Sequence, residues 1–329
     1  MPVLAGDDPA ALAAAAQTLA AGGLVGLPTE TVYGLGARAD QDAAVAAIFA
    51  AKGRPADHPL IVHVAGLDQA GFFASSLPPA AQRLAAAFWP GPVTVIVPRR
   101  AGVAEAASGG QPSIGLRCPS HPVALALLQQ AAALGVPGVA GPSANRFGRI
   151  SPTSAAHVAS EFGPGLLVLD GGDCPLGIES SIVDCSRGHP VLLRPGVLTR
   201  AALQAVLGQP LLAADPSDHS APRAPGTLAS HYAPRARLRL WPSDQLAAAL
   251  DKAATWPAGL AVYSRRPVGS TGGCLWRRMP EDPAEAAHDL FAALRRLDDG
   301  GAAEIWVEQP PDTPVWEGVL DRLRRAASP

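Results

Sequence analysis

Strand-like runs alternate with helical segments along residues 9–205 of this chain. The periodicity is clearest at residues 42–52, where Val45, Ile48, Phe49 and Lys52 fall on one helical face. We predict helices at residues 10–21, 42–52, 80–88, 122–134 and 153–162, and strands at residues 24–27, 60–64, 93–97, 114–117, 136–140, 166–169, 182–184 and 191–194. Ser151 before Pro152 is typical of a helix start. This order predicts an α/β domain with a twisted mixed sheet and flanking helices.

The alternation stops at residues 206–236, a stretch rich in Pro, Ser and Ala that predicts a linker. Regular structure resumes with strands at 238–241, 260–263 and 304–307 and helices near 244–254 and 283–297. We therefore expect a second, smaller α/β, Rossmann-like domain at residues 237–329. Within the linker, residues 226–234 carry His231 and Tyr232 among small residues. We expect this segment to form a lid over a site, the alternative being a passive spacer.

Charge and cysteine content restrict the class of protein. The net charge is −2, so no whole-chain basic field attracts nucleic acid or an anionic membrane, and we expect no stable nucleic-acid binding. The four cysteines form no Cys-x-x-Cys pair, which is typical of a reducing cytoplasm. No apolar run approaches the roughly 20 residues of a membrane helix, and no basic N-terminal flank indicates a secretory signal. We expect a cytoplasmic protein without a membrane span.

Two polar clusters in the first domain are candidates for a site. Residues 28–36 place Thr29, Glu30 and Thr31 directly after a buried strand, where α/β proteins commonly bind ligands, although glycines also favour a simple turn. Lys52 and Arg54 lie two residues apart across a helix end, so both cations can meet one polyanion. The alternative for this pair is a solvated basic helix terminus. Only two residues of the chain are lysine, which suggests that Lys52 stands where arginine cannot substitute.

Other candidates have structural alternatives as well. Arg117 closes an apolar strand that begins near Ser113, and it either reaches the surface or points into a site. His63 lies within a strand, where a hydrogen-bonded core histidine is the commoner case. The loop at residues 140–148 carries Ser143 and Asn145 as anion donors, while Ser151 is first of all a candidate helix cap.

Together, these clusters resemble the YrdC-like family of threonylcarbamoyl-AMP synthases. The resemblance covers about residues 9–205 in order, and residues 225–234 match the linker of the two-domain branch of that family. The matching motifs are residues 28–35, 52–55, 59–63, 88–94, 117–119 and 142–145, with the characteristic Lys-x-Arg and Ser-x-Asn set at Lys52, Arg54, Ser143 and Asn145.

The resemblance implies an activity and its substrates. Threonine takes up bicarbonate to form a carbamate, which attacks the α-phosphate of ATP and releases pyrophosphate; the adenylate serves threonylcarbamoyladenosine modification of tRNA by a downstream transfer machinery. The site residues that it implies are Thr31, His63, Arg117, Ser181 and the Ala140 backbone for L-threonine, and Lys52, Arg54, His58, Ser113, Ser143, Asn145, Ser151, Arg194 and Tyr232 for ATP. Lys52 and Arg54 are expected to act on the reacting phosphates. Mg²⁺ is expected with the triphosphate, without a protein metal site.

Two other classes of protein contain a domain that resembles this one. One is an RNA-binding module of the same fold that forms no adenylate, which the low net charge disfavours. The other is a carbamoyl-transfer maturation enzyme, which would be a much longer chain with zinc-finger cysteines. We therefore expect the adenylate-forming enzyme.

Overall fold

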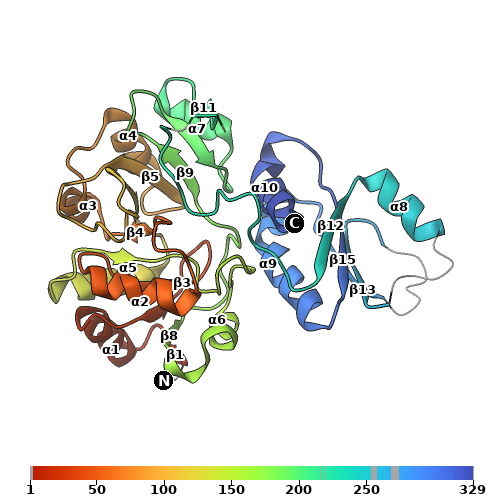
Figure 1. Cartoon of the computed structure of the whole chain (residues 1–329), viewed down its shortest axis with the longest axis horizontal. Coiled ribbons are helices and arrows are strands. Elements are labelled where there is room, and N and C mark those ends of the chain that lie inside the picture. Colours follow the sequence, from red (N-terminus) through yellow and green to blue (C-terminus); the bar gives the residue numbers. More distant parts are fainter. Residues whose placement is uncertain (1–2, 216, 219, 253–257, 268–273, 329) are drawn as a thin grey trace.

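Two β-sheets joined by a linker make up this protein (Figure 1). The computed structural model describes residues 3–215, 217–218, 220–252, 258–267 and 274–328. In this part of the chain, every helix is too short or too polar to cross a lipid bilayer.

The larger sheet has eleven strands in the order β1-β8-β2-β3-β7-β4-β6-β5-β9-β10-β11. The sheet contains both parallel pairs, such as β4·β6, and antiparallel pairs, such as β5·β6, so the predicted mixed sheet is confirmed. Its strands are β1 (Val3–Ala5), β2 (Val25–Leu27), β3 (Gly34–Arg38), β4 (Ile61–His63), β5 (Val93–Pro98), β6 (Ser113–Arg117), β7 (Val139–Ala140), β8 (Leu167–Asp170), β9 (Ser181–Asp184), β10 (Val191–Arg194) and β11 (Leu212–Ala213). Strands β1 and β11 pair with this sheet although they lie outside residues 9–205. The boundaries of the first domain stay a prediction.

Helices cover one face of this sheet fully and the other face in part. Val62 of β4 and Val168 of β8 point into the core that contains α2 and α4, whereas Leu167 and Leu169 point to α1 and α5. Over β4, β5 and β9 the second face is covered by linker residue Ala224 instead. The helices of this domain are α1 (Pro9–Ala20), α2 (Asp42–Lys52), α3 (Leu67–Phe73), α4 (Pro79–Phe88), α5 (Pro122–Ala133), α6 (Ala155–Phe162) and α7 (Arg200–Leu207).

Two helix ends matter for the site. Helix α2 ends where Gly53 adopts the left-handed conformation at φ 65°, which leaves Lys52 in the last turn as the sequence predicts. The predicted cap at Ser151 is wrong. Helix α6 begins at Ala155, and Ser154 is its cap, accepting a hydrogen bond from the His157 amide. Ser151 is thereby left in the loop that precedes the helix.

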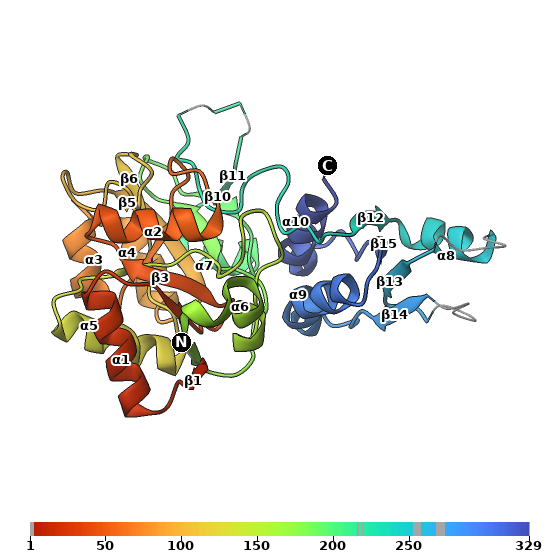
Figure 2. The same cartoon turned by 60° about the horizontal axis from the view of Figure 1, so that its bottom comes forward.

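The smaller sheet is fully parallel, in the order β12-β15-β13-β14. Its strands are β12 (Arg237–Trp241), β13 (Leu260–Ser264), β14 (Leu275–Arg278) and β15 (Glu304–Glu308), and its helices are α8 (Ser243–Lys252), α9 (Pro283–Asp299) and α10 (Glu317–Ala326). The sequence analysis missed β14 and α10. In both views α9 and α10 face the larger domain, and α8 lies on the far side (Figures 1 and 2). The predicted second α/β unit is confirmed.

The two domains meet backbone to backbone at two glycines. A Cβ atom on Gly177 would lie 2.4 Å from the His288 carbonyl oxygen of α9. A Cβ atom on Gly318 of α10 would lie 2.4 Å from the Gly196 carbonyl oxygen, just beyond β10. Any side chain at either glycine would force the domains apart. The smaller domain is therefore closely docked on the larger one.

Candidate functional site

A small cavity of about 40 Å³ lies between the carboxyl ends of β2, β4 and β6, the loop after β7, and the linker. Its walls combine three arginines with threonines and glycines. The lining residues are Thr29, Thr31, Val32, Gly34, Arg54, Ile61, His63, Arg117, Gly141, Pro142, Ser143, Glu179, Arg194, Pro225, Gly226, His231 and Tyr232. Seven predicted site residues are among them: Thr31, Arg54, His63, Arg117, Ser143, Arg194 and Tyr232.

Arg117 at the end of β6 points into the site and not to the surface. It is only 3% exposed, and its Nη1 donates to Thr31 Oγ1 at 2.9 Å. Its Nη2 lies 2.7 Å from Glu30 Oε1. Glu30 Oε2 also accepts a hydrogen bond from the Ser120 amide. Because a buried charge needs a partner, Glu30 holds Arg117 in place at the cavity wall.

Lys52 is buried, so the alternative interpretation of this residue as part of a solvated basic helix end is wrong. Its Nζ donates to the carbonyl oxygens of Ser143 at 2.6 Å and Asn145 at 2.5 Å. Burial lowers the pKa of the ammonium well below its ordinary value, and the nearby Arg54 lowers it further. Lys52 therefore ties helix α2 to the loop that carries Ser143 and Asn145.

Arg54, which lies just beyond helix α2, and Arg194, at the end of β10, both line the cavity. Arg54 donates to the Pro59 carbonyl oxygen at 2.9 Å, and burial lowers its pKa to about 10. Arg194 at the end of β10 donates to the Ser180 carbonyl oxygen at 3.1 Å, and burial also lowers its pKa. Two buried guanidinium groups without a carboxylate hydrogen bond of their own form a strong anion site.

The linker closes the cavity. The Ala233 amide donates to the Gly148 carbonyl oxygen at 2.8 Å, which fixes the segment against the loop after β7. Tyr232 adopts φ 63° and is 1% exposed. Its ring lies 4.2 Å from the His231 ring and 5.4 Å from the Phe291 ring of α9, measured between centroids. Tyr232 is therefore packed between the cavity and the smaller domain.

Buried polar atoms without a hydrogen-bond partner gather around this cavity. Among the described residues, four such atoms belong to side chains that line the cavity, namely Arg54 Nε, His63 Nδ1, His231 Nδ1 and Tyr232 Oη. Two more, Asn145 Oδ1 and Ser181 Oγ, belong to predicted site residues that are not among the lining residues. A buried polar group left unpaired costs roughly 1–3 kcal/mol, so such a concentration is unfavourable unless a ligand satisfies it. Five of the six belong to residues that the sequence analysis expected to bind threonine or ATP, and His231 belongs to the predicted lid segment.

The remaining predicted residues lie at different distances from the cavity. Ser151 Oγ donates to Glu179 Oε1 at 2.5 Å, so it supports a lining residue. The Ala140 backbone pairs with Val62 of β4 beside the cavity. Ser113 begins β6 at the strand end opposite Arg117 and lines a separate groove with Arg187 and Ser220. His58 contacts the Phe147 ring at 5.5 Å and does not line the cavity.

Comparison with known proteins identifies the family. A family model described as telomere recombination (Sua5_yciO_yrdC) matches residues 17–196, and a model of the threonylcarbamoyl-AMP synthase C-terminal domain matches residues 198–328. The threonylcarbamoyl-AMP synthase of Pyrococcus abyssi is 37% identical over 327 residues, 95% of this chain and 93% of the relative. This chain belongs to the threonylcarbamoyl-AMP synthase family.

Further relatives agree with this assignment. The threonylcarbamoyl-AMP synthase of Bacillus subtilis is 37% identical over 338 residues, 98% of this chain and 94% of the relative. The crystal structure of P. abyssi Sua5 complexed with L-threonine superimposes with a TM-score of 0.86 at 34% identity, over 96% of this chain and 94% of that one. The predicted family, its two-domain form and its enzyme class are thus confirmed.

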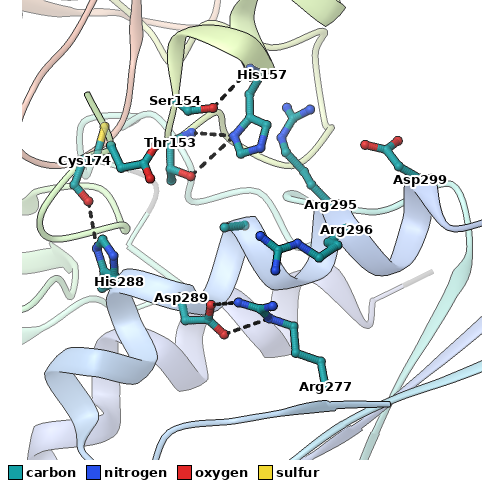
Figure 3. A pocket seen from close by; sticks show the side chains of 12 residues that line it. Thr153, Ser154, His157, Cys174, Arg277, His288, Asp289, Arg295, Arg296 and Asp299 are labelled. Carbon is teal, nitrogen blue, oxygen red and sulfur yellow. Dashed lines mark hydrogen bonds and ion pairs between the residues drawn. The ribbon is translucent and has the colours of Figure 1, made fainter. Parts of the chain in front are cut away.

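A second, larger cavity of about 510 Å³ lies between the domains, lined by α9 and by the start of α6 (Figure 3). Several of its charged groups pair with carboxylates. Arg277 forms an ion pair with Asp289, and Arg295 lies 2.8 Å from Glu161. His288 and the Cys174 carbonyl oxygen are 2.9 Å apart across the interface. Among the described residues, none that lines this cavity has a buried polar atom without a hydrogen-bond partner, in contrast to the synthase site.

Sequence reasoning missed three residues of the synthase site. Glu30 stands within residues 28–36, which the sequence analysis singled out, and Glu179 stands two residues before Ser181, yet neither carboxylate received a role. Their signal was a single acid among small polar residues beside a strand. Arg322, which contacts Glu179 from α10, has no local signal because it lies in an ordinary arginine-rich helix.

Acid should destabilise the fold through two buried histidines. Burial lowers the pKa of His63 to about 3, with Arg117 lowering it further, and burial also lowers the pKa of His231 to about 3. Between about pH 6.5 and pH 3, the folded state therefore binds fewer protons than the unfolded state. For each of the two histidines, the free energy of unfolding should fall by up to about 1.4 kcal/mol for every pH unit of acidification in this range. Urea unfolding at pH 7 and pH 5 measures this loss.

His63→Gln is the test variant. His189→Gln is its matched control, because His189 is exposed. The first should reduce the difference in unfolding free energy between the two pH values, and the second should not. An unchanged pH dependence in His63→Gln would contradict the assignment.

Proposed function

We propose that this protein forms L-threonylcarbamoyladenylate and pyrophosphate from L-threonine, bicarbonate and ATP, in the cytoplasm, for threonylcarbamoyladenosine modification of tRNA. The observation that carries the proposal is a cavity lined by Arg54, Arg117 and Arg194, in whose walls buried polar atoms of Arg54, His63, His231 and Tyr232 have no hydrogen-bond partner. Such a site favours two anionic ligands bound side by side. A carbamate and a triphosphate are both anions.

In this proposal, Arg117 binds the threonine carboxylate and is oriented by Glu30. Thr31, His63, Ser181 and the Ala140 backbone surround the rest of threonine. The unpaired Nδ1 of His63 and Oγ of Ser181 suit its amine and hydroxyl groups. The carbamate then forms when the amine attacks bicarbonate, with loss of water.

The nucleotide phosphates lie against Lys52, Arg54, Ser143, Asn145 and Arg194. Ser151 supports this site indirectly, because its hydroxyl group donates a hydrogen bond to Glu179. A carbamate oxygen attacks the α-phosphorus, and the bond to pyrophosphate breaks. Cations stabilise the charge that develops, so no protein nucleophile is required. Mg²⁺ would arrive with ATP as part of the substrate. His58 and Ser113 are proposed at the outer part of the nucleotide.

The linker must open for substrates to enter. The volume of the cavity, about 40 Å³, is far below the roughly 300–1,000 Å³ of small-molecule sites. Tyr232 and Pro225 line it directly. We propose that residues 206–236 act as a lid that excludes water from the mixed anhydride, anchored by the domain at 237–329.

The test is pyrophosphate release from ATP. It should require threonine and bicarbonate together, because the carbamate is the attacking group. Serine should be about 10- to 200-fold poorer than threonine in kcat/KM, since it lacks one methyl group. Equal pyrophosphate release without threonine would refute the proposal. The adenylate itself should be detected by mass spectrometry and should pass to the tRNA-modifying machinery.

A further inference from the structure

Helix α10 of the smaller domain inserts one arginine behind the wall of the synthase site. The Arg322 side chain is 0% exposed, and all three of its nitrogens are used. Nε donates to Glu179 Oε2 at 2.9 Å, Nη2 donates to the Glu179 carbonyl oxygen at 3.1 Å, and Nη1 donates to the Pro195 carbonyl oxygen at 2.6 Å. Its guanidinium carbon also lies 5.6 Å from the centroid of the Tyr232 ring. One side chain from α10 thus contacts three segments around the cavity.

Glu179 lines the cavity with a charged carboxylate. Burial alone would raise its pKa, but Arg322, Arg194 and the hydrogen bond from Ser151 together hold the pKa below its ordinary value. The carboxylate therefore stays ionised beside a site proposed to receive phosphates. An uncompensated negative charge there would repel a triphosphate.

Arg322 supplies the compensating charge from outside the cavity. Arg194 already donates to the Ser180 carbonyl and hydroxyl oxygens and to the Pro225 carbonyl oxygen, and not to Glu179. Without Arg322, Glu179 would have Arg194 as its nearest available cation, since the two interact electrostatically in the folded protein. Pairing with Glu179 would withdraw Arg194 from a bound phosphate.

The docking of α10 is close enough to fix this arrangement. Gly318 lies one helical turn before Arg322 and allows α10 to approach the Gly196 backbone directly. Gly196 follows the strand that ends in Arg194. The helix therefore rests on the same segment that carries the site arginine.

We infer that the smaller domain is a working part of the nucleotide site, with Arg322 as a positioning residue that neutralises Glu179 and so keeps Arg194 available for the phosphates of ATP. This inference rests on the proposed function. It gives the domain at 237–329 a role beyond anchoring the linker. It also makes nucleotide binding depend on domain docking.

The experiment compares Arg322→Met, Arg322→Lys, Glu179→Gln and the double variant Arg322→Met with Glu179→Gln in the full chain. Arg322→Met should raise the KM for ATP at least about tenfold, as expected for loss of a charged hydrogen-bond partner, and change the KM for threonine less than threefold. Adding Glu179→Gln should recover most of that loss, because the unpaired carboxylate is gone. Arg322→Lys should lie between wild type and Arg322→Met. Binding of a non-hydrolysable ATP analogue, measured by calorimetry without threonine, should follow the same order.

Arg324→Met is the matched control. Arg324 lies two residues further on α10, where it forms an exposed ion pair with Asp312, so kinetics and binding should stay at wild-type values. Equal effects of Arg322→Met on both substrates, or a double variant worse than Arg322→Met, would overturn the inference. If Arg322→Met does not fold, Arg322→Lys decides it: ATP kinetics and analogue binding at wild-type values in that variant would overturn the inference.

The inference and the proposed function fail in different ways. Wild-type protein that releases no pyrophosphate refutes the proposed function. Active wild type with unchanged nucleotide binding in Arg322→Met refutes the positioning role alone.

Discussion

Arg117→Ala should raise the KM for threonine about 10- to 150-fold and lower the free energy of unfolding by about 3–5 kcal/mol. The first effect follows from the proposed contact with the threonine carboxylate. The second follows from Glu30, which is 4% exposed and would be left as an unpaired buried carboxylate. Threonine titration of pyrophosphate release and urea unfolding measure the two effects separately.

A second substitution separates binding from stability. Adding Glu30→Gln to Arg117→Ala should restore much of the unfolding free energy, because no buried charge then lacks a partner, but should leave the threonine defect in place. Arg278→Ala is the surface control, since its ion pair with Glu281 is exposed on both sides and should contribute less than about 1 kcal/mol. Recovery of threonine affinity in the double variant would contradict the role of Arg117.

Lys52→Met should reduce kcat/KM for ATP at least about 100-fold and lower the free energy of unfolding by about 2–6 kcal/mol, as two buried carbonyl groups lose their donor. Those carbonyls belong to Ser143 and Asn145, so the loop that faces the phosphates should lose its position as well as a charge. ATP titration with saturating threonine and urea unfolding are the measurements. Lys52→Arg should not restore ATP use, because a planar guanidinium does not fit a site built for a compact ammonium.

Arg146→Met is the matched control for Lys52. Arg146 also donates to a backbone carbonyl at the end of α2, that of Ala51 at 2.6 Å, but from an exposed position. Its loss should change ATP use less than threefold. A Lys52→Met variant with wild-type ATP kinetics would remove Lys52 from the site.

Local sequence predicted most elements because their signals are local. Gly53 and the face formed by Val45, Ile48 and Phe49 predict α2 to the residue. Ser151 was misread as a cap because a serine before a proline is typical of a helix start, whereas α6 begins only at Ala155 and Ser151 Oγ bonds to Glu179 instead. Helix α10 (Glu317–Ala326), beyond the last predicted strand at 304–307, was not predicted.

For the site, the sequence by itself determined the cations and small polar residues and the order of their motifs, and hence the family. Only the tertiary structure decided how the charges pair. Arg117 meets Glu30 across 87 positions, and Arg322 meets Glu179 across 143. Sequence patterns report backbone conformation and burial over a few residues, whereas Coulomb and hydrogen-bond energies depend on distances that exist only after distant segments pack. Which buried charges are neutralised, and which remain available to a substrate, is therefore a property of the folded chain.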